Sequence, residues 1–222
     1  MSESLLTAFR GVQSRFGWWC AIRSSLDQIL NRFMTFDCLH CVVLPRENLR
    51  PVDPAGTAHI TSRFATQEDI DSMQRDPRLK IYEPKITYFK QGDACLLTYI
   101  DGKLAGYAWA HTRGCPELIP GLVISVPNDL LYNYASLTLP EFRGHNLQPY
   151  RHRMLLESDR WKDKRGLFGY VKATNWASQK GLVKSGYRVV GQIWLIGSKK
   201  RFLAFFSPSL KKMNVRRLPS AG

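Results

Sequence analysis

The sequence contains no uncharged apolar stretch of about 18 residues, so we expect no membrane-spanning helix. Its N-terminus has no basic segment followed by a clean apolar run and a small-residue cleavage site, so we expect no secretory signal. Internal repeats and low-complexity tracts are also missing, which excludes a solenoid or a repeat array. Nothing in the composition indicates disorder, because an apolar fraction of 44% in 222 residues supplies the core of one substantial domain.

The cysteines are few and have no regular spacing: Cys20, Cys38, Cys41, Cys95 and Cys115. Cys38 and Cys41 form a C-x-x-C pair, but no second pair completes a zinc site. The pair lies in an apolar run over residues 38–44, where free cysteine packs as a small buried side chain. We therefore expect structural, reduced thiols, no metal and a cytoplasmic location, with metal or redox work as the alternative.

Acidic residues are scarce relative to basic ones. The chain has 18 Asp and Glu against 32 Lys and Arg, a net charge of +14 and a pI near 9.8. This balance favours polyanions, anionic membranes or phosphate-rich small molecules without choosing among them, and a merely solvated surface also explains it. Part of the charge lies near the C-terminus, in residues 199–201, 211–212 and 216–217. No nucleic-acid motif accompanies it, so a nucleic-acid partner is not favoured.

Residues 1–35 carry apolar side chains at helical spacing on either side of Gly17. The second half has Trp18, Ile22, Leu26, Ile29 and Phe33 on one face, and arginines occupy the opposite faces at Arg10, Arg15, Arg23 and Arg32. Such a segment could lie on an anionic membrane, cap the core of the domain, or pair with a second copy in a homodimer. The sequence leaves these alternatives open.

A loop rich in proline, aspartate and glycine, over residues 45–56, is the expected domain boundary. It follows a predicted strand at 39–44. We therefore divide the chain into an N-terminal amphipathic helical extension with its linker (1–56), a main domain (57–210) and a basic C-terminal tail (211–222).

From His59 onward, strand and helix patterns alternate. Thr66 begins a helix with carboxylates in its first turn, and Asp101-Gly102 predicts a tight hairpin. The predicted strands are 59–65, 94–100, 104–110, 129–139, 167–174, 187–196 and 202–206, and further helices lie around 154–161 and at 176–184. This order predicts a mixed sheet covered by helices.

The first segment that indicates chemistry runs from Leu137 to Gln148, where a strand turns into a helix. Unpaired amides at the start of a helix, together with its dipole, form an anion site that suits a pyrophosphate. Arg143 adds a fixed charge, and Gly144 allows close approach of a ligand to the backbone. A simple turn would explain this segment equally well by itself.

The second segment runs from Val171 to Ser178 and is followed by Gly186-Tyr187. Here a strand ends at Asn175 and a short helix begins. The side chain of Asn175 can both donate to and accept from an amide of a ligand. Alternatively, it caps the helix.

In this order and spacing, the two segments resemble the acyl-CoA-binding half of the GNAT (Gcn5-related N-acetyltransferase) superfamily, over residues 58–206. Residues 140–144 match the family's Pro-Glu-aromatic-Arg-Gly stretch. Asn175, Ser178 and Gly186-Tyr187 are similar to the start and the end of its next helix. The resemblance implies an α/β (α+β) fold, with a mixed, mostly antiparallel sheet flanked by helices.

The resemblance implies direct transfer of an acyl group, most often acetyl from acetyl-CoA, to an amine acceptor, with no metal. The implied cofactor-binding residues are Leu137, Thr138, Leu139, Arg143, Gly144, His145, Asn146, Leu147, Gln148, Asn175 and Ser178. Candidates for the catalytic base are Glu141, His111, Tyr132 and Tyr134. By strand alternation, Tyr132, Tyr134 and Ser136 would share one face, opposite Leu137 and Leu139.

The sequence departs from the family at two places. Asn146 and Gln148 occupy glycine positions of the loop, although asparagine tolerates a left-handed backbone. Leu182 stands where many members have the tyrosine that protonates the leaving thiolate. Two other functions therefore stay open: a long-chain acyltransferase acting on an amino acid or lipid at a membrane surface, and a noncatalytic module that binds an anionic partner.

Overall fold

The computed structural model describes residues 3–49, 59–81, 83–111, 117–198 and 201–218. Its helices are α1 (Glu3–Phe16), α2 (Trp18–Phe33), α3 (Gln67–Gln74), α4 (Glu83–Lys90), α5 (Leu147–Glu157), α6 (Trp176–Lys184) and α7 (Pro208–Lys212). Its strands are β1 (Thr35–Pro45), β2 (Ile60–Phe64), β3 (Ala94–Ile100), β4 (Lys103–His111), β5 (Glu117–Ile119), β6 (Leu122–Ile124), β7 (Leu130–Thr138), β8 (Gly166–Lys172), β9 (Arg188–Gly197), β10 (Phe202–Phe206) and β11 (Arg217–Leu218).

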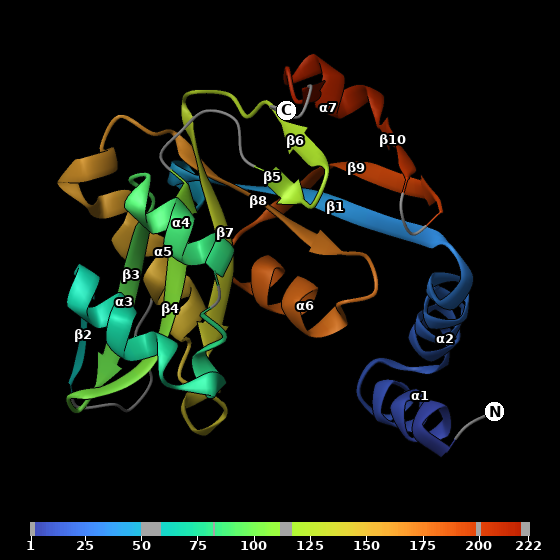
Figure 1. The fold of residues 1–222 in the computed structure, drawn as a ribbon, viewed down its shortest axis with the longest axis horizontal. Helices are drawn as coiled ribbons and strands as arrows, with labels where there is room; N and C mark the ends of the chain where they lie inside the picture. The colour runs from blue at the N-terminus through green and yellow to red at the C-terminus, as the bar shows by residue number, and fades with distance from the viewer. Residues whose placement is uncertain (1–2, 50–58, 82, 112–116, 199–200, 219–222) are drawn as a thin grey trace.

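Strands form one large sheet in the order β10-β9-β1-β8-β7-β4-β3-β2 and a small sheet in the order β11-β6-β5. Helices α3 and α4 cover one face of the β2–β4 half, and α5 covers the other (Figure 1). Pairing in the large sheet is antiparallel except between β7 and β8. The predicted mixed, mostly antiparallel sheet flanked by helices is confirmed.

Local signals in the sequence set several of these elements. Thr66 caps α3, because its hydroxyl accepts from the amide of Asp69 (3.3 Å) while the Asp69 carboxylate accepts from the amide of Thr66 (2.7 Å). Asp101 and Gly102 take positive φ angles of 47° and 74° in the turn between β3 and β4. Both predictions are confirmed, as is the hairpin of β9 and β10.

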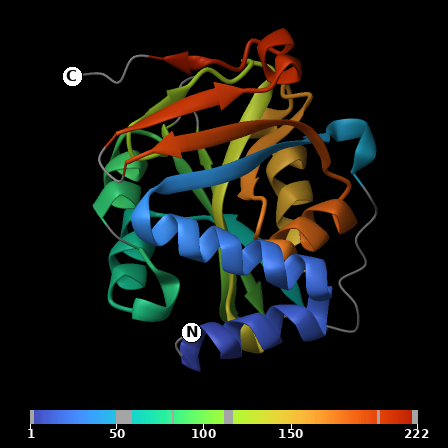
Figure 2. The same ribbon diagram turned by 90° about the vertical axis from the view of Figure 1, so that its right-hand side faces the viewer.

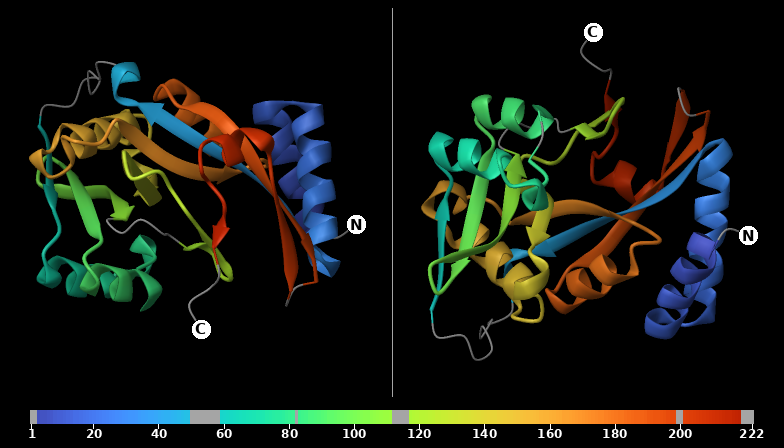
Figure 3. Two further views of the ribbon diagram at one scale, coloured as in Figure 1. Left: turned by 90° about the horizontal axis from the view of Figure 1, so that it is seen from above. Right: turned by 60° about the horizontal axis from the view of Figure 1, so that its bottom comes forward.

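Strand β1 lies inside the large sheet, between β8 and β9, and pairs antiparallel with both. Figure 3 shows it running through the molecule to α2. The predicted boundary at residues 45–56 is therefore wrong as a division of the sheet, since residues 35–45 belong to the same sheet as the main domain. The helical extension ends near residue 34. Residues 50–56 of the predicted loop lie outside the described residues.

The C-x-x-C pair is part of β1. Cys38 and Cys41 are buried and free, as predicted for structural thiols. Burial raises the pKa of the Cys41 thiol to about 12, which keeps it protonated and unreactive. Cys115 lies outside the described residues.

The described part of the predicted basic tail packs against the domain. Val215 is fully buried, and β11 pairs with β6. Leu210 and Val215 belong to the same apolar cluster as the core residues of β6. Residues 211–218 therefore belong to the domain, and the prediction of a separate tail is wrong for this segment.

A β-bulge interrupts β7 where it faces β4. Tyr134 pairs with Trp109 and Leu137 with Tyr107, so Ala135 and Ser136 together face a single residue. Ala135 takes a left-handed φ of 46°. Tyr134 and Leu137 consequently pack in one cluster with Leu139, and the predicted alternation that separated them is wrong.

Gly106 of β4 packs directly against this bulge. A Cβ atom there would lie 2.2 Å from the Leu137 carbonyl oxygen and 3.0 Å from the buried Arg151 guanidinium. We expect Gly106→Ala to lower the free energy of unfolding by about 3 kcal/mol, because the backbone of β7 must move. Urea unfolding measures this. Gly11→Ala in α1, where a Cβ has room, is the matched control, and equal effects of both substitutions would contradict the packing described here.

Candidate functional site

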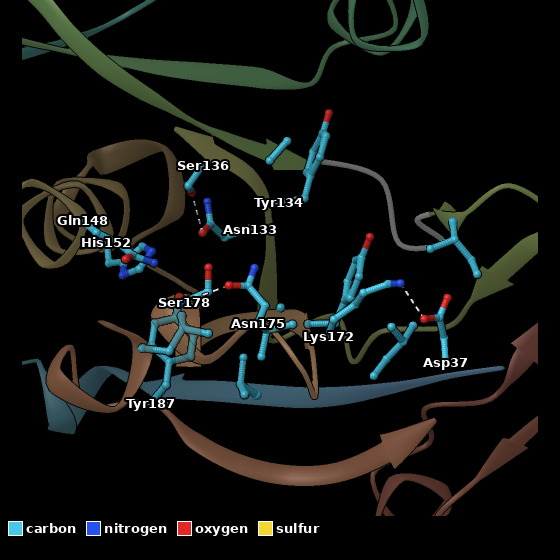
Figure 4. Close-up of a pocket in the computed structure, with 18 residues that line it drawn as sticks. Asp37, Asn133, Tyr134, Ser136, Gln148, His152, Lys172, Asn175, Ser178 and Tyr187 are labelled. Carbon is cyan, nitrogen blue, oxygen red and sulfur yellow. Dashed lines mark hydrogen bonds and ion pairs between the residues drawn. The ribbon is translucent and has the colours of Figure 1, made fainter. Parts of the chain in front are cut away.

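Strands β7 and β8, the only parallel pair among the described strands, diverge a few residues after their pairing begins. Strands β7 and β8 pair from Leu130 with Gly166 to Tyr132 with Phe168, and no further. Beyond that point a pocket of about 430 Å³ opens between them (Figure 4). Residues 133–136 of β7 form one wall and residues 169–172 of β8 the other. We call this the central pocket.

A second pocket of about 580 Å³ adjoins the central pocket at the start of α5, and we call it the loop pocket. Ser136, Gln148 and Ser178 line both. Most of the predicted cofactor-binding residues line the loop pocket: Leu137, Thr138, Arg143, Gly144, Asn146, Leu147, Gln148 and Ser178.

The loop pocket has the properties of an anion site. Gly144 and Asn146 take positive φ angles of 93° and 54°, so Asn146 adopts the left-handed backbone expected of it. The amides of Leu147 and Gln148, at the start of α5, have no acceptor within the described chain. Lys184 donates to the side-chain oxygen of Asn146 (2.8 Å), which brings a second cation beside the exposed Arg143.

Gln148, the second departure from the glycine pattern, lies against α6. Its side-chain oxygen is 2.9 Å from where a Cβ of Gly181 would be. The absence of a side chain at Gly181 therefore makes room for Gln148 between α5 and α6.

Asn175 caps α6 and lines the central pocket. Its side-chain oxygen accepts from the amide of Ser178 (3.2 Å), which confirms the capping interpretation. The side-chain NH₂ group has no partner within the described residues. Capping and ligand binding are therefore compatible, since they use different atoms of one amide.

A third pocket, of about 450 Å³, adjoins the other end of the central pocket and is lined by several titratable side chains. We call it the tyrosine pocket. Its polar lining comprises Lys85, Tyr88, His111, Glu117, Tyr132, Tyr134 and Tyr170. Tyr134, Ala135 and Tyr170 line this pocket and the central one, so the bulge of β7 stands at their junction.

Two of the predicted bases meet on one buried carboxylate. The Nδ1 atom of His111 lies 3.0 Å from the Asp93 carboxylate, and the Tyr134 hydroxyl donates to the same carboxylate at 2.7 Å. Burial, followed by the nearby Asp93 charge, raises the pKa of Tyr134 above its ordinary value. The Nε2 atom of His111 is buried and has no partner within the described chain. Asp93 was missed from the sequence, because a lone acid after a turn carries no motif.

The sequence itself matches no protein family and no curated protein. The fold is similar to that of an acetyltransferase from the GNAT family of Novosphingobium aromaticivorans DSM 12444, with a TM-score of 0.51 and 18% identity over 76% of this chain and 67% of that chain. This chain has the GNAT fold. A GCN5-related N-acetyltransferase from Kribbella flavida aligns over 77% of this chain but only 62% of its own length, with 14% identity and a TM-score of 0.49.

Three predicted site residues lie away from these pockets of the GNAT fold. Glu141 is half-exposed, lies 3.4 Å from Arg78 and lines a separate hollow, so it is not among the bases brought together. Leu139 is buried and its amide donates to Ala105, on the side of β7 away from β8. His145 is half-buried and lines none of the three pockets.

The central pocket is also lined by three residues that the sequence did not single out, Asp37, His152 and Lys172. Lys172 forms an ion pair with Asp37 (2.5 Å), and His152 packs edge-on against Tyr187. Leu182 lines the same pocket, so the position of the usual tyrosine presents no hydroxyl. No cluster of three metal-ligating side chains and no helix able to span a membrane occurs in the described parts of the chain.

His152 is expected to make stability depend on pH. Burial, then the neighbouring Arg151, lowers its pKa to about 3, against about 6.5 in an unfolded chain. Between these values only the unfolded state takes up the proton. Protonation of His152 therefore leaves the free energy of unfolding unchanged above pH 6.5, and lowers it by up to about 1.4 kcal/mol per pH unit below pH 6.5. Urea unfolding at two pH values below 6.5 should show that the free energy of unfolding changes less with pH in His152→Gln than in the wild type. His59→Gln, at an exposed position, is the control, and equal slopes for wild type and His152→Gln would reject this assignment.

Proposed function

We propose that this chain is an acyl-CoA-dependent N-acyltransferase that transfers an acyl group, most simply acetyl, directly to an amine. The observation that carries the proposal is a row of three adjoining pockets, of which the central one lies between the diverging strands β7 and β8. An anion site lies at one end, and a buried histidine paired with a carboxylate lies at the other. In this proposal, the loop pocket would hold a phosphate-bearing donor, the central pocket its thioester arm, and the tyrosine pocket the base for the acceptor.

The loop pocket would hold the pyrophosphate of the donor. Free amides at the start of α5 and the charges of Arg143 and Lys184 suit an anion with several oxygens. The pantetheine arm would lie along β7 in the central pocket, with the Asn175 amide beside it. The thioester would then lie at the bulge, where a backbone amide would polarise its carbonyl, a contribution of about 3 kcal/mol where such donors have been measured.

His111 would take the proton of the amine, directly or through water, while Asp93 holds its Nδ1–H and leaves Nε2 free to accept. The amine nitrogen forms a bond to the thioester carbon, and the carbon–sulfur bond then breaks. The products are an amide and CoA. Since Leu182 offers no proton, the thiolate would be protonated by water or by a phenol lining the central pocket, Tyr134 or Tyr187.

A second candidate has the same mechanism with a long acyl chain and an amino acid or lipid as acceptor. It is favoured by the exposed apolar residues of α2, which include Trp19 and Phe33. Comparing the affinities of acetyl-CoA and palmitoyl-CoA separates the two, since a preference for the short chain rejects the long-chain form.

The proposal predicts that acyl-CoA raises the melting temperature and that CoA thiol is released when an amine is added. A panel of amines, with thiol release followed by a colorimetric reagent, measures turnover. Melting shifts without release from any amine would indicate a noncatalytic module. Neither shift nor release with acetyl-CoA or a longer acyl-CoA would reject the proposal.

A further inference from the structure

Helix α2 has its polar side turned toward the protein. Ala21 and Ser24 are its buried residues, and the Ser24 hydroxyl accepts from the indole of Trp176 (2.9 Å). Asp27 lies near the Thr174 hydroxyl (3.4 Å), and Asn31 donates to the Phe36 carbonyl (2.6 Å). A surface helix normally buries its apolar stripe and exposes its polar face. In α2 this order is reversed.

The outward side of α2 is a continuous apolar surface. At 100° per residue, its exposed apolar side chains fall within an arc of about 120°. They are Trp18, Trp19, Ile22, Leu26, Ile29, Leu30 and Phe33, and we call them the α2 apolar face. Trp19 is 83% exposed and Phe33 is 77% exposed. Single exposed apolar residues are common, but a contiguous face of this kind marks an interaction surface.

Arginines border this face on both sides. By the same helical geometry, Arg23 follows Leu30 at one margin, and Arg32 lies one position beyond Ser25 at the other. The guanidinium of Arg23 lies 5.7 Å from the centre of the Trp176 ring. Both arginines are exposed. Helix α1 packs against α2 through Phe9 and Trp18, whose ring centres are 5.6 Å apart. The exposed Arg10 of α1 therefore adds to the positive charge of this helix pair.

Further apolar side chains lie on the large sheet, beyond the end of α2. Phe36 pairs with Ile196, which pairs in turn with Leu203, so the three side chains lie on one face of β1, β9 and β10. Leu203 is 63% exposed. Figure 2 shows α2 and these strands on the same side of the molecule.

We infer that the α2 apolar face docks on an anionic lipid bilayer, with α2 lying in the plane of the interface. Tryptophan and phenylalanine would enter the boundary between headgroups and acyl chains, while the bordering arginines contact lipid phosphates. The arginines decide for lipid over a second copy of the chain. In a symmetric dimer the same patch meets itself, so arginines at its margins would oppose arginines.

Vesicle flotation tests this with the full chain and two lipid compositions, phosphatidylcholine alone and phosphatidylcholine mixed with phosphatidylglycerol. We expect flotation with the anionic vesicles and much less with the neutral ones. Trp19→Gln/Phe33→Gln should weaken binding by roughly a hundred-fold, since two large side chains lose their place in the lipid. Val183→Gln, at a 65% exposed position of α6, is the matched control and should bind like wild type.

Two flotation results would overturn the inference: no flotation with anionic vesicles, or equal flotation of the wild type and the double variant. A third such result would be a wild-type dimer in sedimentation velocity that does not bind vesicles and that is lost in the double variant. The last outcome would assign the face to a second copy. Circular dichroism checks that both variants are folded. None of these measurements uses acyl-CoA, so their result is independent of the proposed enzymatic function.

Discussion

Replacing His111 by glutamine is expected to lower kcat by roughly 10²- to 10⁴-fold while leaving the affinity for acyl-CoA nearly unchanged. The reason is positional. His111 lies in the tyrosine pocket, beyond the bulge of β7 from the loop pocket, so its loss removes the base without touching the donor site. Steady-state kinetics with an amine substrate measures kcat, and titration calorimetry measures acyl-CoA binding.

Asp93→Asn should also reduce kcat, since an amide at this position can present its NH₂ group to the imidazole and stabilise the wrong tautomer. Tyr134→Phe should have a smaller effect, because it removes one hydrogen bond to the carboxylate while water or Tyr187 can still protonate the thiolate. Both variants require an unchanged melting temperature for the comparison to hold. If His111→Gln keeps wild-type kcat while folded, the base lies elsewhere.

Removing the two cations of the loop pocket is expected to weaken acetyl-CoA binding by roughly a hundred-fold or more. Arg143→Gln/Lys184→Gln loses two charge-assisted contacts to phosphate, each contributing about 1.5–3 kcal/mol. Lys180→Gln is the matched control, because Lys180 is exposed on the same helix as Lys184 and does not line the loop pocket.

The loss should appear as a higher dissociation constant for acetyl-CoA in calorimetry. Added salt should weaken acetyl-CoA binding to the wild-type protein more than binding to the double variant. If the double variant binds acetyl-CoA as tightly as Lys180→Gln does, the phosphates lie outside the loop pocket. The anion site would then have to be sought elsewhere on this basic chain.

Elements specified by short-range signals could be predicted from the sequence. The Asp101-Gly102 turn, the Thr66 cap and the Asn175 cap each depend on residues within three positions, so composition and spacing were sufficient. The strand-to-helix turn at residues 140–148 was found for the same reason, and most of its predicted residues line one pocket.

Elements that depend on distant residues could not be predicted. The central position of β1 is set by pairing with strands more than 120 residues away, as between Leu44 and Leu167. The bulge at Ala135 depends on how β7 matches β4, so alternation alone placed Leu137 on the wrong face. The role of Asp93 becomes visible only when folding brings His111 and Tyr134 to it.

A crystal structure with CoA bound tests the proposed donor site. We expect the pyrophosphate on the amides of Leu147 and Gln148, between Arg143 and Lys184. We expect the pantetheine arm between β7 and β8, and the sulfur near the bulge at Ala135. CoA bound outside the loop and central pockets would contradict the proposal, as would the absence of CoA from crystals grown in an excess of it.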